Sequence, residues 1–246
     1  MILGSKSGWA RGLAACALTA AMAGAAIAGP VVVRAIGPSA RNYPAGKQLP
    51  DNAQLALKAG DTLVLLDSRG TRTISGPGNF PAVATGMRAG TAQTAARILA
   101  NTGTSERRGG AVRGGIPSAT QTRSPNLWLV DLSKSGTVCV ADPAAVRVWR
   151  ANADKAADVK ISSASGAGTI ALAPGATIGA WPKSLPVKDG AEYTMTTDGM
   201  APAIIKFATV PAPTSMEDTA SQLIAKGCKT QLDLLIATTS PGGNAG

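Results

Sequence analysis

The stretch LPVKDGAEYTM, residues 185–195, decides how the second half of the chain is interpreted. Asp189 and Gly190 are turn residues, and residues 191–196 after them are predicted to form a strand. Six further strand-like stretches surround it, with Gly, Pro, Asp and Ser between them: 127–132, 137–141, 145–151, 159–162, 169–172 and 204–210. Short strands separated by turns in this way predict a β-sandwich. A short open sheet is the alternative, although a sheet needs a second layer to bury its apolar face.

The letters DGAEY, residues 189–193, carry a resemblance to a known family. They resemble the D-x-A-x-Y tyrosine corner of immunoglobulin-like sandwiches, and Leu185 before them is similar to the leucine of the same corner in fibronectin type III domains. The resemblance implies that Asp189 and Tyr193 form a structural corner, with the Tyr193 hydroxyl bonded to an upstream backbone group. It also implies that Trp149 is the buried tryptophan of a central strand. Met195 departs from antibody domains, because it stands where their second core cysteine would be.

The N-terminal 28 residues are predicted to be a signal peptide. Lys6 and Arg11 form a basic start, an uncharged alanine-rich run follows, and Ala26-Ile27-Ala28 is a small-x-small cleavage pattern. Cys16 ends a lipobox-like sequence, but the apolar run lies after it rather than before it, so we interpret it as an ordinary signal residue. We expect a periplasmic or secreted protein that begins at Gly29. The alternative is a membrane anchor that is never removed.

Two cysteines, Cys139 and Cys228, lie outside the predicted signal peptide. An even pair in an oxidising compartment suggests a disulfide, and two separately buried thiols are the alternative. The sequence has no CxxC motif, which disfavours disulfide-exchange chemistry.

Charge is distributed unevenly between the two halves. Residues 29–124 contain twelve Lys and Arg against four acidic residues, whereas residues 125–246 contain ten of each sign. In an exported protein such an excess indicates an anionic envelope partner: lipid headgroups, lipopolysaccharide, cell wall or an envelope protein. Nucleic acid is disfavoured by the compartment and by the few aromatic residues among the basic ones. The candidate anion-binding residues are Arg107, Arg108, Arg113, Arg69 and Arg72. A merely solvated basic surface is the alternative.

The predicted fold is mainly β, with a small N-terminal β-domain, an immunoglobulin-like β-sandwich and a short C-terminal helical pair. The N-terminal domain spans 29–100, with strands at 31–34, 54–57, 62–66 and 71–74 and a helix at 90–100. A Gly/Arg/Ser-rich segment at 101–125 is predicted to be a linker, with a functional loop as the alternative. The sandwich spans 126–212, helices at 216–226 and 229–237 lie within 213–240, and 241–246 is a disordered tail.

The stretch AGDTLVLLDSRGTRTISGPGNF, residues 59–80, carries a second resemblance. Its Gly-Asp entry into a strand and its later GPG turn are similar to the periplasmic FecR-type β-domain. This resemblance implies a binding or signal-relay module rather than an enzyme.

The sequence offers few groups for catalysis. It has no histidine, no G-x-S-x-G motif, no P-loop and no dinucleotide fingerprint, and its acidic residues are scattered. Ser133 and Lys134 are adjacent, which on a strand would point them to opposite faces. We therefore predict a non-catalytic exported binding, sensing or assembly protein with neither cofactor nor metal. The alternative is a histidine-free envelope hydrolase with an unrecognised serine nucleophile.

Overall fold

The computed structural model describes residues 29–83 and 123–240. The predicted signal peptide, the helix at 90–100, the greater part of the linker with Arg107, Arg108 and Arg113, and the C-terminal tail lie outside the described residues. The described chain is mainly β, with a β-sandwich and a C-terminal helical pair, as the sequence predicts.

The N-terminal module, residues 29–83, consists of two small sheets packed around an apolar centre. One sheet has the order β1-β3-β4, and β2 pairs with β5 in the other. The bounds are β1 Val31–Ile36, β2 Gln54–Leu57, β3 Thr62–Asp67, β4 Gly70–Ser75 and β5 Gly78–Pro81, with a 3-10 turn η1 at Ala40–Asn42. Val32, Leu55 and Leu63 lie between the sheets. Val31 and Val33 point the other way, because successive residues of a strand face opposite sides.

The sandwich packs a sheet of order β10-β9-β12-β13-β7 on a shorter sheet of order β11-β8-β6. The strands are β6 Leu129–Asp131, β7 Gly136–Val140, β8 Arg147–Trp149, β9 Ala157–Ser163, β10 Gly166–Leu172, β11 Ile178–Ala180, β12 Glu192–Thr197 and β13 Ala203–Thr209. Trp149 lies in the central strand of the shorter sheet and is 1% exposed, in the position that the sequence predicts. Trp181, Tyr193 and Phe207 meet edge to face in the core, with ring centroids 5.2 to 5.3 Å apart.

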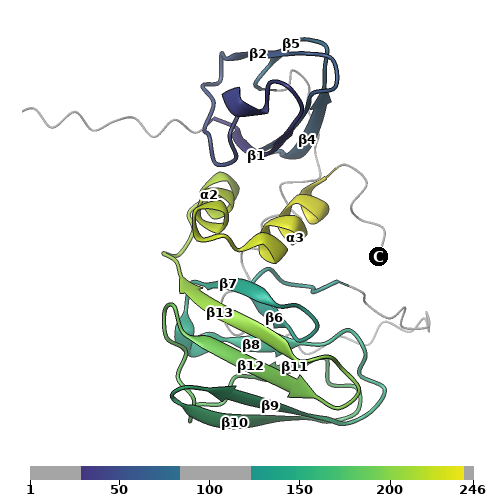
Figure 1. Cartoon of the computed structure of the whole chain (residues 1–246), viewed down its shortest axis with the longest axis vertical. Coiled ribbons are helices and arrows are strands. Elements are labelled where there is room, and N and C mark those ends of the chain that lie inside the picture. Colours follow the sequence, from purple (N-terminus) through teal and green to yellow (C-terminus); the bar gives the residue numbers. More distant parts are fainter. Residues whose placement is uncertain (1–28, 84–122, 241–246) are drawn as a thin grey trace, which may run out of the picture.

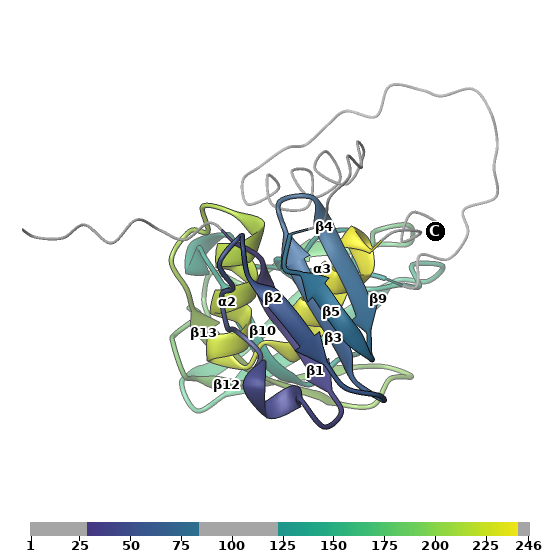
Figure 2. The same ribbon diagram turned by 90° about the horizontal axis from the view of Figure 1, so that it is seen from above.

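Two helices form a middle layer between the N-terminal module and the sandwich (Figure 1), and in the view from above the strands of the module lie over them (Figure 2). They are α2, Met216–Lys226, and α3, Lys229–Thr239. Leu223 of α2 and Leu235 of α3 share one apolar core with Val31 from the module and Cys139 from the sandwich. We expected the helices to pack on an edge or face of the sandwich. They do so, and they also cover the outer face of the β1-β3-β4 sheet.

The ends of α2 follow the signals in the sequence. The Ser215 hydroxyl accepts a hydrogen bond from the Asp218 backbone N–H at 3.1 Å and so caps the first turn. Gly227 ends the helix with φ at 73°, a left-handed conformation that glycine adopts without strain. This turn brings Cys228 back toward the sandwich and starts α3.

A disulfide and a buried glutamine fasten α3 to the outer strand β7. Cys228 is bonded to Cys139 of β7. The Gln231 side chain accepts from the Cys139 backbone N–H at 2.6 Å, and its amide donates to the carbonyls of Cys139 and Leu127, both at 2.9 Å. The amide therefore occupies the place of a neighbouring strand and satisfies the edge of β7 where it is buried.

The Tyr193 hydroxyl joins the core to the backbone upstream of β12. It donates to the Pro186 carbonyl at 2.8 Å and accepts from the Lys188 N–H at 3.2 Å. The Asp189 carboxylate accepts from the Thr209 N–H at 2.7 Å, which ties the same turn to β13. Both residues of the predicted corner thus hold the 185–190 loop onto the sandwich.

Three segments differ from their predicted form. The strand predicted at 145–151 begins only at Arg147, because Asp142 caps a short 3-10 turn, η3, at Pro143–Ala145. Gly78 of the expected GPG turn belongs to strand β5. Strand β11 was not predicted, and its Gly179 lies so close to Ile170 and Leu172 that a Cβ there would approach them to 2.8 and 2.6 Å.

Reduction of the disulfide should destabilise the protein by about 4–5 kcal/mol in the chain-entropy model, because it frees a loop closed across 89 residues. Urea unfolding with and without reductant measures the loss, and the Cys139→Ser/Cys228→Ser variant should match the reduced protein. Titration of the denatured, unreduced protein, prepared without residues 1–28 and therefore without Cys16, should detect no free thiol. Two titratable thiols would contradict the bond.

Tyr193→Phe should lower the free energy of unfolding by about 1–2 kcal/mol, because it removes the two part-buried hydrogen bonds of a buried side chain, to the Pro186 carbonyl and from the Lys188 N–H. Tyr43, the other tyrosine, provides a matched control: its hydroxyl contacts the Ala56 carbonyl at 3.3 Å in an exposed position. Tyr43→Phe should change stability by less than about 0.5 kcal/mol. Equal effects in urea unfolding would argue against a structural corner at Tyr193.

Candidate functional site

The predicted anion-binding residues that the structure describes, Arg69 and Arg72, lie on the hairpin of β3 and β4. Arg72 donates from one terminal nitrogen to the carbonyls of Pro81 and Ala82, and its Nε is buried without a partner among the described residues. Burial lowers the pKa of Arg72, and the nearby Asp67 partly opposes this effect. Arg72 therefore fastens the last strand of the module to β4 and is a structural group rather than an open anion site.

Arg69 sits in the hairpin turn beside an acidic residue. Its guanidinium lies 3.8 Å from the Asp67 carboxylate, which also accepts from the Arg69 backbone N–H at 2.8 Å. Asp67 is thus a turn residue with its own charge partner. The Arg69 side chain is 37% exposed.

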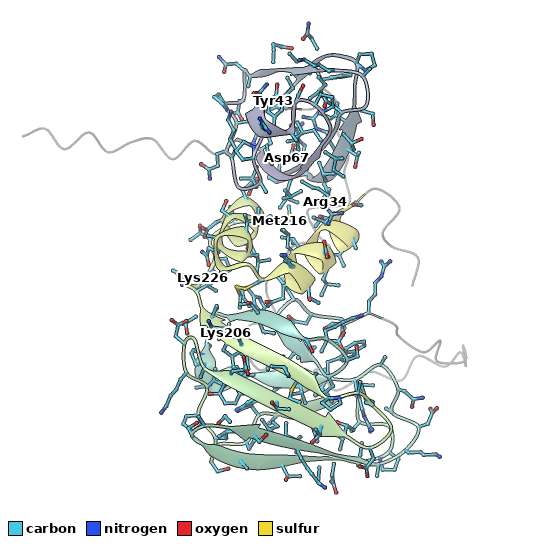
Figure 3. All side chains as sticks on the ribbon, in the orientation of Figure 1. Arg34, Tyr43, Asp67, Lys206, Met216 and Lys226 are labelled. Atoms are coloured by element: carbon cyan, nitrogen blue, oxygen red, sulfur yellow. A yellow bond between two sulfur atoms is a disulfide. The ribbon has the colours of Figure 1, made fainter. Side chains whose placement is uncertain are left out.

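Three basic residues that the sequence analysis did not single out are exposed on the module: Arg41, Lys47 and Lys58. Arg41 lies in η1, and Lys58 follows β2. The Lys47 ammonium lies 5.7 Å from the centre of the Tyr43 ring and donates to the Asn42 carbonyl at 2.8 Å. The hydroxyl of Tyr43, which is labelled in Figure 3, donates to the Ala56 carbonyl of β2 at 3.3 Å and so links this corner of the module to β2.

Asp61 holds the two segments that carry Arg41 and Lys58. It is 3% exposed, and its carboxylate accepts from the Ser39 N–H at 2.8 Å and from the Lys58 N–H at 2.5 Å. Burial raises the pKa of Asp61, but the hydrogen bonds from Ser39 and Lys58 outweigh it and the pKa lies below its usual value. One buried carboxylate therefore connects the η1 loop with the turn after β2.

Arg34 is a further exposed cation, but it already has a partner. Its guanidinium bonds to Asp233 of α3 at 2.7 Å, with both side chains more than half exposed. An exposed pair of this kind adds little stability, though it compensates the charge of Arg34. Figure 3 shows Arg34 beside α3, between the module and the helical layer.

A groove of about 350 Å³ lies between α3 and the segment that leads into β7. Leu127, Leu129 and Leu234 are among its apolar lining residues, and Arg123 and Lys134 also line it. Ser133 and Lys134 lie in the turn beside it, not on a strand, and the Ser133 hydroxyl donates to Asp131 at 2.7 Å. The Asp131 carboxylate also accepts from the Ser133 backbone N–H at 2.8 Å, so both donors of Ser133 bond to the last residue of β6.

Within residues 29–83 and 123–240, no cluster of three or more His, Cys, Asp or Glu side chains could hold a metal ion. None of the helices in the same ranges has the length and apolar character needed to cross a bilayer.

Asp61→Asn should destabilise the protein at neutral pH, and the stability of the variant should depend less on pH in the acid range than that of the wild type. Folding lowers the pKa of the Asp61 carboxyl. Its contribution to the free energy of unfolding is therefore complete above the pKa of the unfolded state, about 4, and is lost as the pH falls through the lower pKa of the folded state. Urea midpoints between about pH 7 and pH 2 measure this. Asp158→Asn, at an exposed position of β9, is the control and should leave the curve near that of the wild type.

Comparison with known proteins found no match: no family model matches the chain, and neither a curated protein nor a solved structure resembles it significantly.

Proposed function

We propose that the protein is a non-catalytic binding or assembly protein of the cell envelope, whose basic N-terminal half contacts an anionic envelope component. The observation that carries the proposal is the charge distribution: twelve basic against four acidic residues in 29–124, and ten of each afterwards. A surplus of this kind attracts polyanions and lipid headgroups without requiring a deep pocket.

The described surface of the module carries exposed cations, which supports anion binding, but they are not the hairpin arginines Arg69 and Arg72. Arg41, Lys47 and Lys58 are exposed, and none forms an ion pair closer than 4 Å with a described carboxylate. Arg72 is withdrawn into backbone contacts, and Arg69 lies beside Asp67. We therefore assign the contact to the first three, together with Arg107, Arg108 and Arg113 of the segment that follows.

The proposal includes the relationship of the sandwich to immunoglobulin-like domains. The bonds of the Tyr193 hydroxyl to Pro186 and Lys188 and the buried Trp149 support it. In this proposal the sandwich and the FecR-like module are binding modules, and the helices hold them in a fixed arrangement.

The test is co-sedimentation of the purified protein with vesicles that contain anionic lipid and with purified cell wall, across a salt series. Binding should weaken with rising ionic strength, because charges are screened over about 8–10 Å near physiological salt. Each cation near an anionic membrane contributes about 1 kcal/mol, so Arg41→Gln/Lys47→Gln/Lys58→Gln should weaken vesicle binding roughly 100-fold.

The matched control removes three exposed cations from the sandwich, Lys155→Gln/Lys160→Gln/Lys206→Gln, and should bind almost as well as the wild type. A third variant, Arg107→Gln/Arg108→Gln/Arg113→Gln, measures the share of the segment after the module. Equal losses in the control and in the first variant would contradict the assignment. Absence of wild-type binding at low salt to both vesicles and cell wall would overturn the proposal.

A further inference from the structure

Strand β10, Gly166–Leu172, is the outermost strand of the five-stranded sheet. It pairs only with β9 among the described strands, and Figure 1 shows it at the end of the sandwich farthest from the helices. Its sequence, GAGTIAL, contains neither a charged residue nor a proline. Natural edge strands usually carry such residues, or a bulge, to prevent pairing with another chain.

The backbone of β10 alternates between β9 and the outside. A two-residue turn closes the β9–β10 hairpin, so its last pair, Ser163 and Gly166, is hydrogen-bonded. Hydrogen-bonded pairs recur at every second residue, so Gly168, Ile170 and Leu172 also bond to β9. The residues between them, Ala167, Thr169 and Ala171, direct their backbone N–H and C=O groups away from β9. The Thr196 hydroxyl, on the far side of β9, reaches the Lys160 carbonyl at 3.4 Å, which agrees with this assignment.

The inner face of β10 is covered by the chain itself, but its outer edge is not. Gly179 of β11 packs against Ile170 and Leu172, and Pro182 packs against Gly168. The side chains of Ala167, Thr169 and Ala171 are all exposed, and within the described ranges no other segment donates to or accepts from their backbone. Three consecutive outward pairs of hydrogen-bonding groups therefore face solvent.

We propose that β10 pairs with β10 of a second copy of this chain, antiparallel and about a twofold axis at Thr169. This inference is independent of the proposed anion binding. The axis places Thr169 opposite Thr169 of the partner subunit and Ala167 opposite Ala171 of the partner subunit. The two five-stranded sheets then form one continuous sheet, and all outward backbone groups of β10 find partners.

The outward residues of β10 match those of a second antiparallel copy, which favours a second copy over an unrelated strand. Their order, Ala167, Thr169, Ala171, is the same in both chain directions, so alanine faces alanine and threonine faces threonine across the axis. Lys160, the β9 neighbour of Thr169, is the nearest cation to the axis along that row. It lies three strand spacings, about 14 Å, from its copy, beyond the screening length of about 8 Å.

The other edge of the same sheet explains why assembly should stop at two copies. There Gln231 and the disulfide occupy β7 at Cys139, and α3 covers the strand. A sheet that can extend on one side only gives a closed, symmetric dimer rather than a filament. Since one strand pair is a small interface, we expect a weak dimer, with a dissociation constant between about 1 µM and 1 mM.

The test uses two double variants of the full protein that differ at one position, studied by sedimentation over about 1 µM to 1 mM. Ala167→Lys/Ala171→Lys places like charges opposite each other across the axis, twice, and should weaken dimerisation roughly tenfold or more. Ala167→Glu/Ala171→Lys places opposite charges there and should retain the dimer. Positions 167 and 171 are four residues apart on one strand, so within one copy they do not meet.

Ser162→Lys, on the same outer face but in β9, is the control and should dimerise like the wild type. Urea unfolding verifies that each variant is folded. A wild-type protein that is monomeric at every concentration would overturn the proposal, as would a dimer that both double variants leave intact. If both double variants are monomeric, the antiparallel register is wrong, and wild-type species larger than a dimer would contradict closure at two copies.

Discussion

The arrangement of the whole molecule depends on how strand β7 ends its sheet. A buried strand edge with unpaired N–H and C=O groups is costly, because those groups lose water without gaining a partner. Here the Gln231 amide supplies the partner for Cys139, and the disulfide to Cys228 holds the helix that carries it. Once α3 is fixed in this place, α2 and the N-terminal module have a surface on which to pack. A polar side chain in a helix thus completes a sheet.

The structure shows that the basic residues of the first half differ in how far they are available to a partner. Counted along the sequence, every arginine of the first half contributes equally to a basic surface. In the structure Arg34 is paired with α3 and Arg72 binds backbone carbonyls at the end of β5. Of the cations that remain exposed, Arg41 and Lys58 lie on loops that Asp61 holds in place, and Lys47 lies beside Tyr43. The basic character is therefore concentrated on loops rather than spread over the strands.

Much of the fold could be predicted from local patterns. Strand β2 and helix α2 have the predicted bounds, since strand-forming residues between turns and a Ser cap with a Gly stop are readable from short segments. Strands β5 and β11 were missed because they are short and contain glycine, and Gly179 is needed only because β10 packs against it. The role of Gln231 could not be predicted, since its partner Cys139 lies 92 residues away. The backbone partners of Arg72 lie only nine and ten residues away, but they could not be predicted either, because every residue has a carbonyl and the residue types do not show which one a side chain reaches.

The contacts between the first and the last elements have a consequence for how the chain matures. Val31 and Leu66 on the module are buried by helices that end at residue 239, and the pairs Arg34–Asp233 and Thr71–Thr239 span 199 and 168 residues. Contacts of such separation form slowly and only when both ends are present. During synthesis, the module exposes an apolar face until the final helices have been made. A chain that ends before α2 would leave this apolar face exposed. Exposed apolar surface is what chaperones and proteases bind in incomplete molecules.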